Sequence, residues 1–237
     1  MKQKPVSAAL QPFLEGKMLL LNKPLHWTSF DVVKKVRIAT GISKVGHAGT
    51  LDPLATGLLI VCTGGFTKKI NDFMGLAKVY TGTITLGAVT PSYDLETEPE
   101  PVADAQNIPE SAIYAATQQF VGNILQMPPQ HSAIKKDGKP LYLSARKGIT
   151  VEVQPRPITI HAFEITNIQL PIVYFRVHCS TGTYIRSLAN DFGAALGVGG
   201  YLSSLCRTAI GEYTLDNAME IAAFEAQIAM LKNTSNI

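Results

Sequence analysis

The chain has 237 residues, 46% of them apolar and 16% charged, and its formal net charge is +3. These values are ordinary for a globular protein large enough to bury a sizeable core, and the mild charge permits a nucleic-acid partner without requiring one. No apolar run approaches 18 residues, which excludes a membrane span. No long apolar segment follows the basic N-terminus, so we expect no signal peptide. The three cysteines lack metal-ligand spacing, so we expect buried free thiols in a reducing compartment, the cytoplasm.

The first elements in chain order are an arm, a strand and a helix. Residues 1–16 contain two prolines and no periodicity, and we expect an extended arm. A short buried strand is predicted at 18–21. A helix follows Thr28, which can cap it with Asp31 in capping-box spacing, and Gly41 is placed to end it. A solvated helix face is the simplest interpretation of its basic residues, which are Lys34, Lys35, Arg37 and, just beyond, Lys44.

The segment 46–57, Gly-His-Ala-Gly-Thr-Leu-Asp-Pro-Leu-Ala-Thr-Gly, places Asp52 in a tightly bent loop. Its glycines allow the bend, and Pro53 biases Asp52 towards an extended or turn conformation. The unbroken apolar run 58–62 has the length of a buried strand and would anchor the loop to the core. Because a loop aspartate is most often a turn former, the loop alone leaves open whether Asp52 is structural or catalytic.

The middle of the chain alternates between regular elements and charged loops. We expect a short helix at 66–74 and a half-buried strand at 78–86 that turns Tyr80 towards the core or a cleft. Residues 91–110 carry six acidic and no basic residues and several prolines, which indicates a surface loop. A helix is expected from Pro109 onwards.

Positive charge is concentrated in the next segment. Between 127 and 156 there are six basic residues and two acidic ones, and Asp137-Gly138 fits a hairpin turn. Aromatic residues are interleaved with the basic ones. The segment is therefore interpreted either as a basic hairpin that binds phosphates or as a solvated loop. The basic residues are Lys135, Lys136, Lys139, Arg146, Lys147 and Arg156.

The last third predicts a strand pair at 158–170 and 172–179, a helix capped by Thr183, a strand at 205–210 and a helix from about Asp216. Hairpins outnumber crossovers, so the fold class is α+β rather than a parallel α/β sheet. No repeat or interdomain linker is visible, and we expect a single domain over 1–237.

Few residues are arranged for chemistry. The five histidines have no metal-ligand spacing, and the sequence holds neither a P-loop nor a GxGxxG motif, so a metal or nucleotide cofactor has no support. Asp52 remains, together with the glycine-bounded segment 180–186, which puts Tyr184 and Arg186 in the first turn of a helix. Alone, Arg186 would be an ordinary surface helix residue.

The segment 46–57 resembles the catalytic motif of the TruB family of tRNA pseudouridine synthases. The resembling blocks span about residues 17–215 in the family's order, more than chance would give. They are Asn22-Lys23-Pro24, Lys78-Val79-Tyr80, Pro128-Pro129 with Ser132-Ala133-Ile134-Lys135, Asp137-Gly138-Lys139, Gly182-Thr183-Tyr184-Ile185-Arg186 and Leu205-Cys206-Arg207. The resemblance implies the pseudouridine synthase fold, a mixed, mostly antiparallel sheet flanked by helices, with 127–150 as an inserted RNA-binding thumb hairpin.

The resemblance implies an isomerase that converts a uridine in the T-arm loop of tRNA to pseudouridine. Asp52 matches the nucleophile, and Tyr80 matches the tyrosine that stacks on the flipped-out base and is a candidate for proton transfer. Arg186 matches the arginine that pairs with the catalytic carboxylate. Such a pair would keep Asp52 ionised, because a close positive charge lowers the pKa of a carboxylate. The reaction only rearranges bonds, so no cofactor is expected.

Further matches concern substrate binding. His47 matches the histidine that holds the flipped-out conformation of the RNA, and Tyr184 and Leu205 match residues that line the uracil pocket. The remaining expected substrate contacts are Lys23, Lys135, Lys139, Arg146 and Arg207.

The sequence also departs from the family pattern. Cys206 replaces one of two arginines that often follow the leucine, which weakens the case for a phosphate contact there. The residues after 215 are too few for the C-terminal PUA domain of many relatives, so we expect a short form without it. We expect a monomer with no obligate protein partner. The alternatives are a non-catalytic tRNA-binding or folding chaperone on the same fold and a pseudouridine synthase acting on another RNA.

Overall fold

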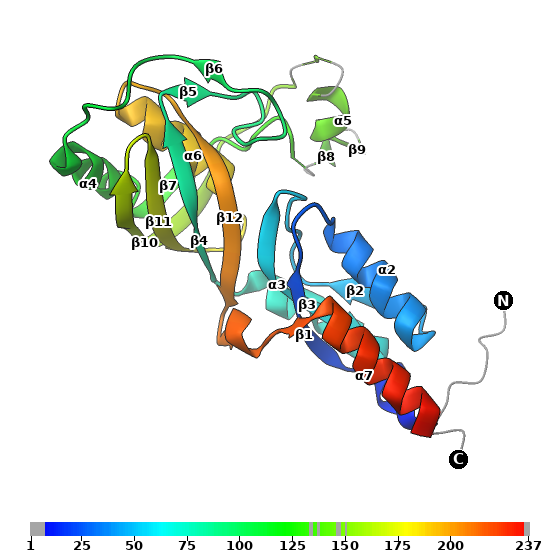
Figure 1. The fold of residues 1–237 in the computed structure, drawn as a ribbon. Helices are drawn as coiled ribbons and strands as arrows, with labels where there is room; N and C mark the ends of the chain where they lie inside the picture. Colours follow the sequence, from blue (N-terminus) through cyan, green and yellow to red (C-terminus); the bar gives the residue numbers. More distant parts are fainter. Residues whose placement is uncertain (1–7, 133–134, 137, 146–147, 150, 235–237) are drawn as a thin grey trace. The chain divides into compact units, whose positions relative to one another are not determined.

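The computed structural model describes residues 8–132, 135–136, 138–145, 148–149 and 151–234, which form two compact units (Figure 1). Unit 1 contains the chain up to Val79 and from Cys206 onwards, and unit 2 contains Tyr80–Leu205. The chain passes between the units within strands β4 (Lys78–Leu86) and β12 (Gly200–Ile210). A single catalytic domain over 1–237 stays a prediction.

The sheet of unit 1 is built around β3 (Ala55–Thr63). Strand β1 (Met18–Lys23) and strand β2 (Val45–His47) both pair with it antiparallel, whereas β14 (Met219–Glu220) runs parallel to β1. The end of β12 forms a hairpin with β13 (Tyr213–Thr214). The predicted strands at 18–21 and 58–62 are therefore confirmed.

Both faces of this sheet are covered, which explains the unbroken apolar run in β3. Residues 58–62 are all fully buried. One face packs against α2 (Ser29–Thr40), α1 (Gln11–Glu15) and α7 (Ile221–Thr234), and α2 and α7 lie side by side in Figure 1. The other face packs against the 3-10 helix η2 (Gly64–Lys69) and α3 (Ile70–Gly75). A strand buried on both sides has no polar face to alternate with.

The start of the described chain differs from the expected extended arm. The 3-10 helix η1 (Ala8–Leu10) leads into α1, where Pro12 stands in the first turn and its missing N–H breaks no helical bond. Leu10 and Phe13 are both 3% exposed, and the Phe13 ring packs edge-on against Phe224 of α7 at 6.5 Å. Burial of these two side chains holds the segment in a helix.

Helix α2 forms where the sequence predicts it. The Thr28 hydroxyl accepts from the backbone N–H of Asp31 at 3.1 Å, and the Asp31 carboxylate accepts from the N–H of Thr28 at 2.9 Å. Gly41 ends the helix in the left-handed region at φ +74°. The capping box and the glycine stop are both confirmed.

Unit 2 is a mostly antiparallel sheet in the order β12, β4, β11, β10, β7. Strand β10 (Arg156–Gln169) pairs antiparallel with β11 (Ile172–Cys179) and with β7 (Gly122–Gln126), which confirms the predicted strand pair. Helices α4 (Glu110–Gln118) and α6 (Ile185–Ala195) complete the core around four aromatic rings, those of Phe120, Phe163, Phe175 and Phe192. The α+β class is confirmed in both units.

The charged segments of unit 2 carry small elements. In the acidic stretch β6 (Glu100–Pro101) pairs with β5 (Ala88–Val89). In the basic stretch β8 (Lys135–Lys136) pairs with β9 (Lys139–Pro140) and α5 (Leu141–Ala145) follows. The predicted hairpin is thus present, although Asp137 lies outside the described residues. Gly138 has φ +79°, as a turn of this kind requires.

Two predicted helix starts are wrong. The N-cap of α6 is Tyr184 rather than Thr183, whose hydroxyl instead donates to the Ser180 carbonyl at 3.0 Å. Helix α7 begins at Ile221 and not near Asp216, because the 3-10 helix η3 (Leu215–Asn217) and the strand β14 come first. Pairing of β14 with β1 is a long-range contact that no local capping signal reveals.

Replacing Thr28 with alanine tests the capping box. Thr28→Ala removes the oxygen that accepts from the Asp31 N–H, and we expect the free energy of unfolding in urea to fall by about 1 kcal/mol. Thr28→Ser keeps that oxygen and should retain most of the stability. Equal destabilisation by alanine and serine would show that the hydroxyl does not cap the helix.

Candidate active site

The Asp52 loop of unit 1 is fixed by hydrogen bonds at successive residues. The Leu51 N–H donates to Ser29 Oγ at 2.8 Å, and this hydroxyl donates back to the Leu51 carbonyl at 3.2 Å. The N–H of His26, a residue in the left-handed region at φ +65°, donates to the Pro53 carbonyl at 2.8 Å. Asp52 itself is half-buried. The backbone on both sides of Asp52 is thus tied to the start of α2.

Arg207 ties the two ends of the loop together. Its Nε donates to the Leu58 carbonyl at 2.8 Å and its Nη2 to the Gly49 carbonyl at 3.1 Å. The side chain is 1% exposed. A planar guanidinium can hold two carbonyls at once in fixed geometry, whereas an ammonium acts as a point charge. In this structure Arg207 therefore positions the loop, and its predicted contact with RNA stays a prediction.

Gly57 allows the backbone of Arg207 to come this close. Its φ is +104°, and a Cβ there would lie 2.4 Å from the carbonyl oxygen of Arg207. Any side chain would have to move backbone atoms, so the motif requires glycine at this position. The close contact places the end of the loop against β12 within unit 1.

Lys23 is the second buried cation beside the loop. Its Nζ donates to the carbonyls of Trp27 at 2.6 Å, Pro24 at 3.0 Å and Pro53 at 3.5 Å, and the residue has no exposed surface. The pKa of Lys23 is lowered to about 8, mainly by burial; the negative charge of Asp52 opposes this lowering, and the positive charge of Arg207 adds to it. Lys23 thus also has a positioning role, and its predicted contact with RNA stays a prediction.

His47 lies at the end of β2 in the same unit. It is half-buried, and its Nδ1 has no hydrogen-bond partner among the residues that the structure describes. Burial, followed by the charge of Arg207, lowers the pKa of the imidazole. The neutral ring is therefore the main form at neutral pH, and the predicted role of His47 in holding the flipped-out RNA stays a prediction.

In unit 2, Arg186 forms a buried ion pair that the sequence did not indicate. Its Nη1 lies 3.5 Å from Asp94 Oδ2, and the two side chains are 4% and 7% exposed. The guanidinium also donates to the carbonyls of Ser92 at 3.3 Å and His131 at 2.9 Å. Since Asp94 belongs to the stretch predicted as a surface loop, its burial corrects that prediction at this position. Pairing of Arg186 with Asp52 stays a prediction.

The other predicted residues of unit 2 lie on α6 and on neighbouring strands. The side-chain amide of Gln126 on β7 binds both backbone groups of Tyr184, at 2.8 and 3.0 Å, and so fixes the start of α6. Tyr80 and Leu205 stand on the neighbouring strands β4 and β12, and Tyr80 is 9% exposed. Their roles at the target base stay predictions.

Two of the three thumb residues expected to bind RNA lie on the hairpin. Lys135 is on β8 and Lys139 is on β9, while Arg146 lies outside the described residues. The buried Ser132 at its base has an Oγ with no partner in the described part of the chain. The contacts of Lys135, Lys139 and Arg146 with RNA stay predictions.

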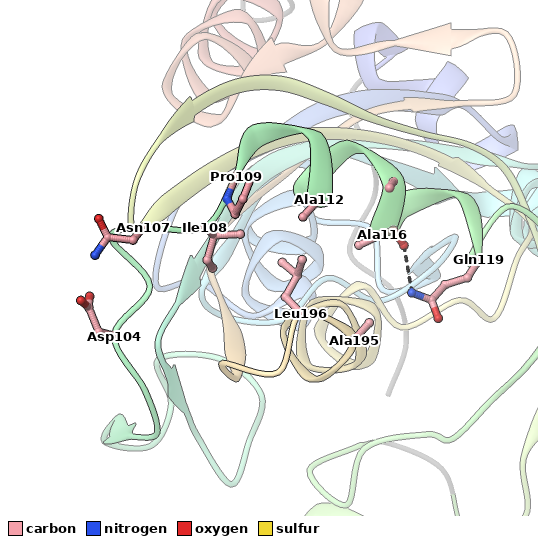
Figure 2. Close-up of a pocket in the computed structure, with 10 residues that line it drawn as sticks. Asp104, Asn107, Ile108, Pro109, Ala112, Ala116, Gln119, Ala195 and Leu196 are labelled. Carbon is pink, nitrogen blue, oxygen red and sulfur yellow. Dashed lines mark hydrogen bonds between the residues drawn. The ribbon is translucent and has the colours of Figure 1, made fainter.

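Unit 2 also contains an open groove of about 650 Å³ between α4 and the end of α6 (Figure 2). Its floor is mostly small apolar side chains, and polar groups such as Asp104, Asn107 and Gln119 stand at its edge. None of the predicted site residues lines it. The groove is thus not the predicted active site.

The described residues hold neither a cluster of metal ligands nor a membrane-spanning helix. No three His, Cys, Asp or Glu residues in the ranges that the structure describes are grouped to hold a metal ion. No helix in those ranges is long and apolar enough to cross a membrane.

Comparison with known families decides the identity of the chain. Residues 37–185 match the model of the "TruB family pseudouridylate synthase (N terminal domain)". The chain belongs to the TruB family. It is thus an isomerase of the pseudouridine synthase class, as the motif at 46–57 implied.

Relatives and solved structures agree with this assignment. The chain is 53% identical over 225 residues to the "tRNA pseudouridine synthase B" of Flavobacterium johnsoniae, covering 92% of this chain and 98% of the relative. It is 53% identical to the protein of the same name from Chlorobium chlorochromatii, covering 87% and 83%. A chain in the "Crystal Structure of a Cbf5-Nop10-Gar1 Complex" matches with a TM-score of 0.74 at 27% identity, over 95% of this chain but only 58% of that one. The pseudouridine synthase fold is confirmed.

The pH dependence of stability tests whether Lys23 is buried as a cation. Its pKa falls from 10.5 in the unfolded chain to about 8 on folding, so between these values the unfolded state binds more protons. The stability of the wild type relative to Lys23→Met should therefore rise with pH, by about 1 kcal/mol between about pH 7 and pH 9. Urea unfolding of both proteins measures this difference, and a difference that does not change with pH would contradict the burial of a charged Lys23.

Proposed function

We propose that the protein converts a specific uridine in the T-arm loop of tRNA to pseudouridine, with Asp52 as the nucleophile. The observation that carries the proposal is the fixed Asp52 loop, in a chain 53% identical to proteins named tRNA pseudouridine synthase B. A protein that only binds RNA has no need for a carboxylate in a loop whose backbone is fixed on both sides of it, beside a buried lysine.

The reaction moves the base from an N1 link to a C5 link on the same sugar. The N1–C1′ bond breaks and its electron pair leaves with uracil, which delocalises the charge. After the base turns, C5 bonds to C1′, the C5 proton is lost to a base and N1 is protonated. Atoms and electrons balance within the nucleotide, so the reaction needs no oxidant, reductant or group donor.

Asp52 supplies the carboxylate for the sugar. A carboxylate can stabilise or capture the electron-poor C1′, as the nucleophile of a retaining glycosidase does. The bonds at Leu51 and Pro53 fix the backbone on both sides of it, so little reorganisation is needed at the reacting atom. A second carboxylic acid is less necessary here, because uracil is a better leaving group than a sugar.

Residues of unit 2 would handle the base. The target must leave the stack, which costs a few kcal/mol. Stacking on an aromatic side chain such as Tyr80 can return about 1–3 kcal/mol of this. Tyr80 is also the candidate that accepts the C5 proton. The buried ion pair with Asp94 holds Arg186 in one place, from which we propose that it acts on the Asp52 carboxylate during the reaction.

Tritium release from tRNA measures the proposed reaction directly. In a transcript labelled at C5 of uridine, pseudouridine formation releases one tritium per product into water. We expect the wild type to release it from one T-loop position and Asp52→Asn to lose at least about 1,000-fold in rate while still binding tRNA. Asp72→Asn, an exposed aspartate of the same unit, is the matched control.

Three outcomes separate the alternatives. Binding without release by the wild type would identify a non-catalytic tRNA binder. Tritium release from another RNA, but not from the T-arm loop, would show that another RNA is the substrate. Unchanged release in Asp52→Asn would remove Asp52 as the nucleophile. Because the negative charge of Asp52 acts on the buried Lys23, the variant's thermal unfolding must be measured to show that it is folded.

A further inference from the structure

Helix α2 leaves one face uncovered that is both basic and apolar. Phe30, Lys34, Arg37 and Ile38 follow each other at helical spacing on the side away from the buried valines, and we refer to them as the α2 outer face. Phe30 is 58% exposed and Ile38 is 65% exposed. Two large apolar side chains are thus exposed among the charged residues of this helix.

Arg37 is held in a fixed position on this face. The carbon of its guanidinium group lies 5.6 Å from the centroid of the Phe30 ring, and its Nη2 donates to the Val45 carbonyl at 2.8 Å. The planar group is thus oriented before any ligand arrives, so it loses less freedom on binding than a free arginine would. Exposure of Phe30 is explained if its ring supports Arg37 rather than joins the core.

The positive charges of the α2 outer face form no ion pair with a carboxylate in the part of the chain that the structure describes. Lys35, on the neighbouring side of the helix, forms an ion pair with Glu225 of α7 at 3.1 Å. In contrast, neither Lys34 nor Arg37 has a carboxylate within ion-pair distance among the residues that the structure describes, and the same holds for the exposed Lys44 beyond the helix. The single acid of the helix, Asp31, is engaged in the capping box.

The helix is also fixed to the Asp52 loop. Ser29, its first residue, exchanges two hydrogen bonds with Leu51. From there a helix of 12 residues extends about 18 Å, at about 1.5 Å per residue. Any RNA whose target base reaches Asp52 must continue beyond the loop, and its backbone can run along this helix.

We propose that the α2 outer face binds the sugar–phosphate backbone of the stem that adjoins the target uridine, with Lys34 and Arg37 on phosphates and Lys44 extending the contact. The proposal rests on the proposed function in that it takes RNA as the substrate. Phosphate oxygens are the acceptors that a pre-oriented guanidinium and free ammonium groups recognise. A protein partner is the weaker fit, because two separate apolar side chains fall far short of the roughly 800 Å² per partner that a stable interface buries.

The salt dependence of tRNA binding tests this proposal. Each lost phosphate contact lowers the slope of log K against log salt by about 0.9. We therefore expect the double variant Lys34→Gln/Lys44→Gln to bind a tRNA transcript several-fold more weakly and with a slope smaller by about 2. Its rate at saturating tRNA should stay unchanged, because the Asp52 loop is intact. Phe30→Ser should weaken binding as well, since Arg37 loses its support.

Control measurements separate a stem contact from a general charge effect. Lys232→Gln removes an exposed lysine from α7, the helix beside α2, and should leave the slope as in the wild type. With a hairpin whose stem is shortened, the double variant and the wild type should bind equally.

The proposal is overturned if the double variant keeps the slope of the wild type, or if Lys232→Gln changes it as much per charge. It is also overturned if sedimentation shows self-association that Phe30→Ser abolishes with RNA binding intact, because the face would then be a protein contact. If the wild type releases no tritium, the proposed function is wrong. The salt dependence of tRNA binding would still test whether the α2 outer face binds RNA.

Discussion

Two buried cations hold the loop on which the proposed chemistry depends. Arg207 and Lys23 are 1% and 0% exposed, and their nitrogen atoms donate to the carbonyls of Gly49, Leu58 and Pro53. Removing two charges from water is costly unless they are hydrogen-bonded and balanced by opposite charge. The carbonyl dipoles supply the hydrogen bonds, and Asp52 supplies negative charge, which partly opposes the lowering of the pKa of Lys23 by burial. The Asp52 carboxylate, which we propose reacts with the sugar, therefore also balances part of the charge of the buried Lys23 that holds its loop.

A similar arrangement occurs in unit 2 around Arg186. The ion pair with Asp94 and the bonds to the carbonyls of Ser92 and His131 hold the guanidinium at the start of α6. His131 and Ser132 stand at the base of the basic hairpin, so Arg186 contacts both the acidic stretch and the segment that we expect to bind RNA. Both buried arginines thus fix backbone segments that were predicted as loops. In unit 1 the residue expected to react stands on backbone that buried charges hold in place, and in unit 2 the Arg186 side chain is itself held by its ion pair and hydrogen bonds.

Local rules predicted what lies within a few residues. The capping box at Thr28, the glycine stop at Gly41 and the bend at Asp52-Pro53 all depend on neighbours in sequence, and the structure shows the first two as predicted. What the sequence could not predict depends on distant contacts. The strand Met219–Glu220 forms because it pairs with β1, and the last helix therefore begins only at Ile221.

The candidate site shows the same limit. Nothing in the sequence distinguishes Asp94 from the other acids of its stretch, since its burial follows from the contact with Arg186. The family resemblance gave the positions of Lys23 and Arg207 and implied contacts with RNA, which stay predictions, but it did not indicate that they support the loop. Their role as loop supports depends on the burial of β1 and on the close approach of β12 to Gly57, which are properties of the folded chain.

The most direct test of this account is the substitution Arg207→Lys. Lysine keeps the charge but cannot hold the carbonyls of Gly49 and Leu58 together in fixed geometry, and hydrogen bonds to charged groups contribute about 1.5–3 kcal/mol. We predict that backbone hydrogen exchange at 48–57 becomes about 10-fold faster or more, while exchange at 58–62 is unchanged, and that kcat on tRNA falls by a similar factor with little change in KM. Unchanged exchange in the loop together with a kcat equal to that of the wild type would show that the buried arginine does not hold the loop for catalysis.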